Sequence, residues 1–327
     1  MGTASTMQIM AEALGLMIPG SALMLSNCQD LEDMATLAGK MVVEMAKKGM
    51  NARDIVTQKS FENAIMVHAV ISGSTNSLLH IPAIAHEFGI HIDSDTFDKM
   101  HRHAHYLLDI RPAGKWPTQF FYYAGGVPRI MEKIKSMLHL DVMTVTGKTL
   151  GENLEELKKN GFYEKCEAYL KPWNLKATDI IRPFDYPIGT NGTVAILKGN
   201  LAKEGAVVKH SAVPKDMFKA ILKAYPFDSE EEAIHAILSH QIQPGDAVII
   251  RYEGPKGSGM LEMFYTTEAI SSDTLLASTI ALITDGRFSG ASKVPAIAHV
   301  SPEAADGGAI ALIEEDDLIE LDIEKEF

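Results

Sequence analysis

Apolar residues recur at helical spacing through the first half of the chain. This period predicts helices within residues 7–17, 30–49, 60–73, 75–89, 94–108 and 127–138. Gly49 is the expected helix-ending glycine of the second segment and Ser60 the expected N-cap of the third. Pro82 interrupts the fourth pattern. We therefore expect a helix-rich first half.

Beyond residue 192 the pattern changes to short apolar runs rich in β-branched residues. These runs predict strands at 193–197, 206–209, 247–252, 280–284, 309–313 and 318–323. A helix pair is predicted at 214–225 and 229–238, the second with a capping box from Ser229 and Glu232. The helix-poor stretch near Pro172, Pro183 and Pro187 marks the boundary. The pattern thus predicts an α/β chain with a first domain over 1–165 and a β-rich second domain over 166–327.

Composition narrows the class of protein. The 327 residues carry 43 acidic and 30 basic side chains, a net charge of −13, so neither nucleic acid nor an anionic membrane is an expected partner. No apolar run is long enough to span a bilayer, and residues 1–17 do not resemble a signal peptide. Cys28 and Cys166 are the only cysteines, which argues against a disulfide framework and favours a reducing, cytoplasmic location.

Two glycine-rich turns follow predicted strands. In "YEGPKGSGMLEM" (residues 252–263), the amides of a loop with three glycines are suited either to an anion or to a simple turn. In "TDGRFSGAS" (residues 284–292), Ser289 lies between glycines after an apolar run, which suits a nucleophile or base but also an ordinary turn. No histidine lies near Ser289 in sequence to activate its hydroxyl.

Other polar clusters have two interpretations each. "MGTASTM" and "SGSTNS" (residues 72–77) precede predicted helices, where they could bind an anion or simply cap the helix. His101 and His105 have the i, i+4 spacing of a metal-binding pair on a helix, and a solvated helix face is the alternative.

Taken together, these motifs resemble the dihydroxy-acid and sugar-acid dehydratase family, which includes phosphogluconate dehydratase. The matching segments run in family order and include "MGTASTM", "SGSTNSLLHIPAIAHEFGI", "AGGVPRIM", "DVMTVTGKTLGENL", "AILKGNLAKEGAVVK", "IRYEGPKGSGMLEM" and "ALITDGRFSGASKVPAIAHVSPEAADGGAIALI". The resemblance implies the remainder of an α/β N-terminal domain followed by a β-barrel-like, swivelling β/β/α C-terminal domain.

The resemblance also implies chemistry. Family members are hydro-lyases that convert a 2,3-dihydroxy carboxylate to a 2-keto acid with an iron–sulfur cluster and Mg²⁺. By its position, Ser289 resembles the catalytic base and Glu262 a magnesium ligand. The substrate or loop candidates are Gly290, Arg287, Thr75 and Lys256. Nearby cations would explain how an unassisted serine becomes a base.

The chain departs from the family pattern in three respects. The cluster cysteines of the family have no counterpart, because neither Cys28 nor Cys166 falls at such a position. The other magnesium ligands also have no counterpart, and "GPKGSGM" is one residue shorter than usual. We therefore expect a fragment that binds no cluster and is inactive by itself.

The sequence favours a sugar acid such as an aldonate as substrate, on the evidence of "MGTASTM" and "RPAGKWPTQFFYYAGGVPRIM". The alternatives are a dihydroxy-acid dehydratase of branched-chain amino-acid biosynthesis and a non-catalytic binding or assembly homologue. The expected partners are a small hydroxy acid and further copies of the chain, as a dimer or tetramer.

Overall fold

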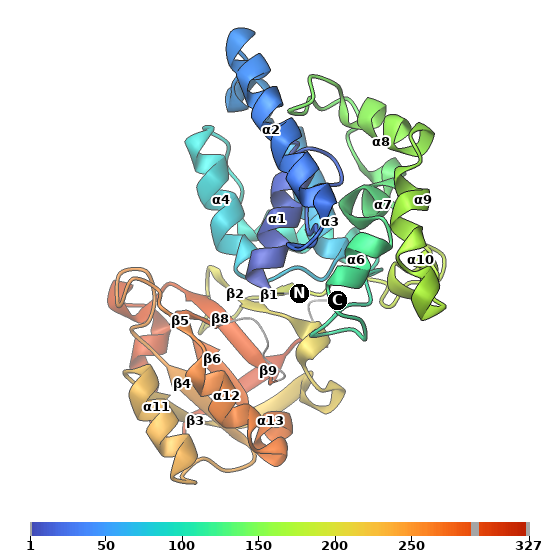
Figure 1. Cartoon of the computed structure of the whole chain (residues 1–327). Helices are drawn as coiled ribbons and strands as arrows, with labels where there is room; N and C mark the ends of the chain where they lie inside the picture. The colour runs from blue at the N-terminus through green and yellow to red at the C-terminus, as the bar shows by residue number, and fades with distance from the viewer. Residues whose placement is uncertain (1, 289–293, 325–327) are drawn as a thin grey trace. The chain divides into compact units, whose positions relative to one another are not determined.

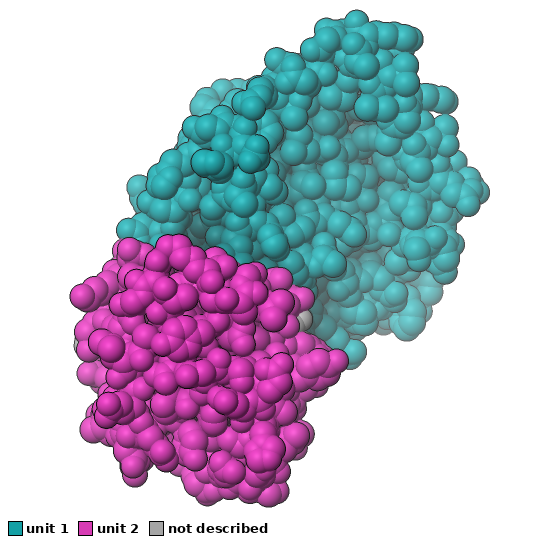
Figure 2. All heavy atoms as spheres, turned by 90° about the vertical axis from the view of Figure 1, so that its left-hand side faces the viewer, with its two compact units in different colours: residues 1–192 teal, residues 193–327 magenta. Residues whose placement is uncertain are grey.

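The computed structural model describes residues 2–288 and 294–324. The chain divides into two compact units, Met1–Gly192 and Thr193–Phe327 (Figure 2). The sequence placed the boundary at 165/166, but residues 166–192 pack within the first unit. Ile181 forms a β-bridge with Leu108, and the Arg182 guanidinium lies 3.0 Å from the Asp109 carboxylate. These long-range contacts explain why the helix-poor stretch belongs to unit 1.

Unit 1 is helical and, in its described part, contains only isolated β-bridges. Its α-helices are α1 Thr3–Ala13, α2 Gln29–Lys47, α3 Gln58–Val70, α4 Ser77–Glu87, α5 Ser94–His103, α6 Gln119–Tyr123, α7 Gly126–Lys133, α8 Leu150–Lys159, α9 Phe162–Ala168 and α10 Ala177–Ile180 (Figure 1). Short 3₁₀ turns lie at Ala52–Asp54, Lys135–Met137 and Lys171–Trp173. The predicted helix-rich first half is confirmed.

Helix α3 is the centre of unit 1. Nearly all of its residues from Ser60 to Val70 are buried, so it has no polar face. Its N-cap is Thr57 rather than the predicted Ser60, and Ser60 is the N3 partner of Thr57 in a capping box. Gly49 follows α2 with φ +69°, as predicted for a helix-ending glycine. Helix α4 continues through Pro82.

Unit 2 is built on a seven-stranded mixed sheet with strand order β1-β2-β8-β6-β4-β3-β9. Its strands are β1 Ala195–Leu197, β2 Gly205–Val208, β3 Lys219–Phe227, β4 Asp246–Ile250, β6 Ala281–Thr284, β8 Ala296–Ser301 and β9 Leu318–Asp322. The four central strands are parallel, and the outer pairs are antiparallel. Strands β5 Glu262–Met263 and β7 Arg287–Phe288 form a separate parallel pair.

Both faces of this sheet are buried at its centre. Strand β4 alternates between them: Ala247 and Ile249 contribute to one core, and Val248 and Ile250 to the other. The second core lies under three helices, α11 Glu230–Leu238, α12 Tyr265–Ser271 and α13 Thr274–Thr279 (Figure 1). Burial on both faces explains the continuous apolar runs of β4 and β6.

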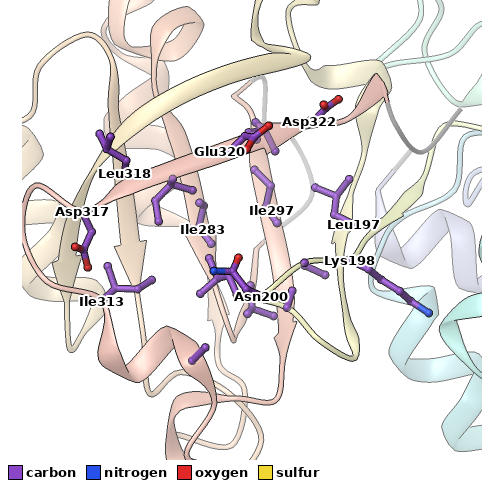
Figure 3. A pocket seen from close by; sticks show the side chains of 18 of the residues that line it. Leu197, Lys198, Asn200, Ile283, Ile297, Ile313, Asp317, Leu318, Glu320 and Asp322 are labelled. Atoms are coloured by element: carbon purple, nitrogen blue, oxygen red, sulfur yellow. The ribbon is translucent and has the colours of Figure 1, made fainter.

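The other face of the sheet encloses a cavity of about 670 Å³ (Figure 3). Leu197 of β1 and Ile319 of β9 both line it, with Ile283 and Ile297 between them. Because β1 and β9 stand at opposite ends of the strand order, the sheet must curl to bring them to one cavity. The α/β chain with a barrel-like second part is thereby confirmed.

Two predicted elements of unit 2 are wrong. Residues 214–225 were expected to be a helix, but after the 3₁₀ turn Lys215–Met217 they enter strand β3, which pairs with β4 on one side and β9 on the other. Residues 309–313 were expected to be a strand but form the 3₁₀ turn Ala309–Leu312. Here the carbonyls of Ala311 and Ile313 accept hydrogen bonds from Arg251 Nη1, both at 3.0 Å, rather than from a neighbouring strand. Further 3₁₀ turns lie at His210–Ala212 and Ala304–Asp306.

Candidate active site

The β5–β7 pair brings Glu262 and Arg287 together. They are Cα partners in the ladder, and Arg287 Nη1 lies 3.6 Å from Glu262 Oε1. Arg287 Nε also donates to the Met260 carbonyl at 2.9 Å, which holds the end of the glycine-rich loop against β7. Met263 and Phe288, next in each strand, are buried, whereas the Glu262 side chain is 43% exposed. The carboxylate is therefore accessible to a ligand from solvent.

Asp285 organises the backbone around this pair. Its carboxylate is buried and accepts hydrogen bonds from the backbone N–H groups of Tyr252 (3.1 Å), Glu253 (3.0 Å) and Ala304 (2.8 Å). The Asp285 carboxylate thus connects its own loop to the two loops that contain Tyr252 and Ala304. The hydrogen bonds compensate for the burial of its charge. The next residue, Gly286, has no room for a side chain, because a Cβ there would lie 2.7 Å from the Glu253 carbonyl oxygen. Asp285 is therefore a structural anchor, not part of an exposed tip.

Glu303 and Lys256 close the glycine-rich loop. The Glu303 carboxylate accepts from the backbone N–H of Lys256 at 2.9 Å and of Gly257 at 3.3 Å, and Lys256 Nζ pairs with the Asp306 carboxylate. Both amides are already bonded to the Glu303 carboxylate, so they are not available to another anion. The turn interpretation of residues 254–259 therefore fits the structure, and the anion-binding interpretation does not.

Two of the candidate residues, Ser289 and Gly290, lie outside the described residues. In sequence Ser289 follows Phe288, the last residue of β7. Its assignment as the base, like that of Glu262 as a metal ligand, stays a prediction.

In unit 1 the two predicted hydroxyl clusters meet. Thr3 Oγ1 lies 2.9 Å from Ser74 Oγ and accepts from Asn76 Nδ2 at 3.1 Å, and Thr6 Oγ1 accepts from the Ser74 amide at 3.1 Å. Neither the Gly2 nor the Asn76 N-cap position makes a side-chain cap hydrogen bond. The clusters therefore bond to each other and do not cap their own helices. Thr75 is half-buried within this loop.

Neither interpretation of His101 and His105 fits the structure: the two side chains do not share a helix face, and His101 is not solvated. Helix α5 ends at His103, so His105 does not share its face; it stacks on Phe184 instead. His101 is buried, and its Nε2 lies 3.0 Å from Nδ1 of His68. His68 Nε2 faces the Ser74 carbonyl at 2.9 Å, so this nitrogen carries the proton. No periodic pattern singles out His68, because it lies on a helix that is buried on nearly all sides.

The thiols do not fit an iron–sulfur cluster. Burial raises the pKa of the Cys166 thiol to about 12, which keeps it protonated, and Cys28 Sγ donates to the Leu25 carbonyl at 3.0 Å. Such clusters are typically held by four thiolates. Among residues 2–288 and 294–324, no three His, Cys, Asp or Glu side chains are grouped to hold a metal ion. Glu262 could supply one oxygen ligand to Mg²⁺, which prefers carboxylates.

Comparison with known proteins agrees with this fold. The family profile for the dihydroxy-acid/6-phosphogluconate dehydratase N-terminal region matches residues 1–153, and that for the C-terminal region matches residues 179–327. Together these matches cover most of both units. The chain belongs to the dihydroxy-acid/6-phosphogluconate dehydratase family, a family of hydro-lyases.

Individual relatives carry the name dihydroxy-acid dehydratase. The chain is 47% identical to dihydroxy-acid dehydratase 1 of Methanosarcina acetivorans over 99% of its own length, and 47% identical to the dihydroxy-acid dehydratase of Methanothrix thermoacetophila over 98%. A similar enzyme of Caldicellulosiruptor bescii is 42% identical over 99%. In each case the match covers 56% of the relative, so the chain spans about half the length of these proteins. In its described part the chain has no helix both long and apolar enough to cross a membrane.

Proposed function

We propose that this chain carries the base and one metal ligand of a dihydroxy-acid dehydratase. The observation that carries the proposal is the pairing of β5 with β7, which places Glu262 beside the strand that leads in sequence to Ser289. The 42–47% identity to dihydroxy-acid dehydratases over nearly the whole chain supports it.

The proposed substrate is a branched-chain dihydroxy acid. The sequence alone favoured a sugar acid, but the relatives described above are named dihydroxy-acid dehydratase. The family profiles are named for both dihydroxy acids and 6-phosphogluconate and do not decide between the two. A dihydroxy-acid dehydratase, which was the alternative in the sequence analysis, is therefore the better supported of the two functions.

In the proposed reaction, Ser289 accepts the proton from C2 of the substrate, and the bond between C3 and its hydroxyl oxygen breaks. The departing hydroxyl takes up a proton returned by Ser289 and leaves as water. The resulting enol becomes the 2-keto acid. Mg²⁺, when bound through Glu262 and ligands from elsewhere, would supply the positive charge that lowers the pKa of a serine hydroxyl. Arg287 would hold the Glu262 carboxylate in place, since its side chain contacts both this carboxylate and Met260. The iron–sulfur cluster, oligomeric assembly and cytoplasmic location stay predictions.

A fragment-complementation assay tests the proposal. The chain is assayed alone and together with the separately produced segment of the Methanosarcina acetivorans enzyme that it does not match, under anaerobic conditions with iron, sulfide and Mg²⁺. We expect no turnover by the chain alone. The mixture should form 2-keto acid from dihydroxy-isovalerate roughly tenfold faster than from xylonate.

Two other outcomes are informative. A faster reaction with xylonate would restore the sugar-acid alternative. A mixture that binds iron and sulfide but dehydrates neither acid would support the binding or assembly homologue.

A further inference from the structure

Unit 1 contains a pair of buried histidines that the proposed reaction does not use. His68 of α3 and His101 of α5 are both buried, and their rings meet edge to face with 5.2 Å between centroids. His68 Nδ1 lies 3.0 Å from His101 Nε2. Phe97 of α5 also packs edge-on against the His68 ring, with 5.8 Å between centroids. Because water is excluded, the hydrogen bonds of this pair must be satisfied by the protein.

Each histidine contacts a different part of the chain. His68 Nε2 donates to the Ser74 carbonyl at 2.9 Å. The His101 carbonyl accepts from the Gly192 amide at 2.7 Å, and a Cβ on Gly192 would lie only 2.4 Å from His101 Nδ1. The pair therefore stands between the loop that carries Ser74 and Gly192, the last residue of unit 1.

The 72–76 loop is held in a strained path by its surroundings. Ser72 has φ +55°, a left-handed conformation that is costly for serine and persists only where neighbouring contacts impose it. Gly73 lies directly on the imidazole, since a Cβ there would be 2.2 Å from His68 Cδ2. His68 is therefore one of the groups that impose the path of the loop.

Tyr106 joins the same two parts of the chain a second time. Its hydroxyl and the Ser72 side chain are hydrogen-bonded. Its backbone N–H donates to the Gly189 carbonyl at 2.9 Å, and its carbonyl accepts from the Ile188 amide at 2.8 Å. The 72–76 loop and the segment 188–192 are thus packed together although they are far apart in sequence.

The proton positions in the histidine pair depend on each other. Because His68 Nε2 carries a proton, Nδ1 of the neutral ring is an acceptor, and His101 Nε2 must donate to it. If the Ser74 carbonyl moves away, His68 is free to adopt the other tautomer, whose Nδ1–H would face the His101 N–H. Two donors cannot share this contact, so His101 must then turn or change its own tautomer, and its ring packs on Gly192.

We infer that the His68–His101 pair is a conformational link that couples the position of the 72–76 loop to that of the segment 188–192. A ligand that displaces the loop loosens the end of unit 1, and displacement of that end loosens the loop by the same factor. The inference does not depend on the dehydratase proposal, because it rests on contacts within unit 1 alone.

Amide hydrogen exchange on the whole chain tests this coupling. In His101→Phe, the Ser74 amide, which is bonded to Thr6 Oγ1, should exchange about five- to tenfold faster, the equivalent of one lost hydrogen bond. In His68→Phe, the Gly192 amide should exchange faster by a similar factor. His101→Gln keeps a side-chain N–H donor and should leave the Ser74 rate within about twofold of the unmodified chain.

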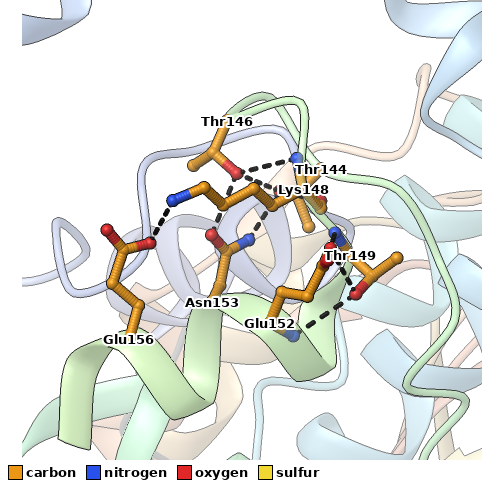
Figure 4. Close-up of polar contacts among 7 residues, drawn as sticks. All are labelled: Thr144, Thr146, Lys148, Thr149, Glu152, Asn153 and Glu156. Carbon is orange, nitrogen blue, oxygen red and sulfur yellow. Dashed lines mark hydrogen bonds and ion pairs between the residues drawn. The ribbon is translucent and has the colours of Figure 1, made fainter. Parts of the chain in front are cut away.

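A matched control and a reference amide complete the experiment. His103→Phe changes an exposed histidine on the same helix and should leave both rates unchanged. The reference is the amide of Asn153, whose side chain donates to Thr144 Oγ1 at 2.7 Å and accepts from Thr146 Oγ1 at 2.9 Å in a separate polar cluster (Figure 4). An equal rise at Asn153, or no rise at the amide distant from each phenylalanine, overturns the inference.

The unmodified chain provides a second test, which stands even if the phenylalanine variants do not fold. Nitrogen-15 chemical shifts of the imidazole rings report which ring nitrogen carries the proton. We expect both His68 and His101 to be protonated on Nε2 at neutral pH. A proton on Nδ1 of His68, or a His101 Nε2 without a proton, overturns the inference.

Discussion

Glu262 and Arg287 face each other across two strands of only two residues each, with 3.6 Å between the carboxylate and the guanidinium. Both side chains are partly exposed, at 43% and 24%. Solvent weakens such a pair, so its contribution to stability is small. The pairing therefore matters more for where the carboxylate lies than for how stable the unit is.

Glu262→Gln separates these two roles. We expect the free energy of unfolding to change by less than about 0.5 kcal/mol. Turnover of dihydroxy-isovalerate by the complemented enzyme should fall about 10²-fold, because an amide is a poor ligand for Mg²⁺. Glu268→Gln removes an exposed carboxylate on the neighbouring helix α12 and should leave the rate unchanged. A similar rate loss in both variants would mean that Glu262 has no special role.

Asp285→Ala should destabilise unit 2 more than any change at its surface. The substitution leaves three N–H groups without their acceptor, two of them buried, and the expected loss is about 3 kcal/mol. Urea unfolding measures it, with Asp216→Ala, at an exposed position, as the control. A loss of similar size in both variants would show that the three-loop anchor contributes little.

Gly257→Ala tests the path of the glycine-rich loop. An added Cβ would lie 2.1 Å from the Tyr252 carbonyl oxygen, so the backbone must shift. We expect a loss of about 2 kcal/mol in thermal or urea unfolding. Gly199→Ala adds the same methyl group where no atom lies within 4 Å and should be nearly neutral. If Gly257→Ala is equally neutral, the loop follows another path.

The elements of the fold that depend on local pattern could be predicted, and those imposed by distant pairing could not. Helix α11 is an example of the first kind, because Ser229 caps it within the segment itself. Strand β3 is an example of the second. Its Ala, Lys and Leu residues favour a helix, but pairing of Lys223 with Asp246 and of Lys219 with Asp322 makes it a strand.

Glu12 makes the stability of unit 1 depend on pH. Burial raises its pKa from 4.5 to about 7, despite hydrogen bonds from the Gly20 and Ala22 amides. Between these values the folded state holds a proton that the unfolded state has released, so the free energy of unfolding falls as pH rises through this window. The loss approaches about 3 kcal/mol above pH 7.

Glu12→Gln should remove this pH dependence. Urea unfolding at pH 5 and pH 8 gives the comparison, and Glu87→Gln, at an exposed position, should retain the slope of the unmodified chain. An unchanged slope in Glu12→Gln would show that another group titrates in this window.

The family motifs pointed to Glu262, Arg287 and Lys256, and the roles assigned to them stay predictions. The functions of Asp285 and Glu303 as acceptors for loop amides could not be foreseen, because they depend on contacts across 19 to 47 residues. Likewise, the contact between Thr3 and Ser74 spans 71 residues. Residue type and spacing indicate which groups are present, and tertiary packing decides which of them meet.

The rate of 2-keto acid formation by the complemented enzyme carrying Ser289→Ala is the most direct test of the proposed function. If Ser289 is the base, the rate falls about 10²- to 10⁴-fold while the iron content is unchanged. Ser278→Ala, on the exposed side of α13, should retain the full rate. A Ser289→Ala enzyme as fast as the unmodified one would contradict the proposed function.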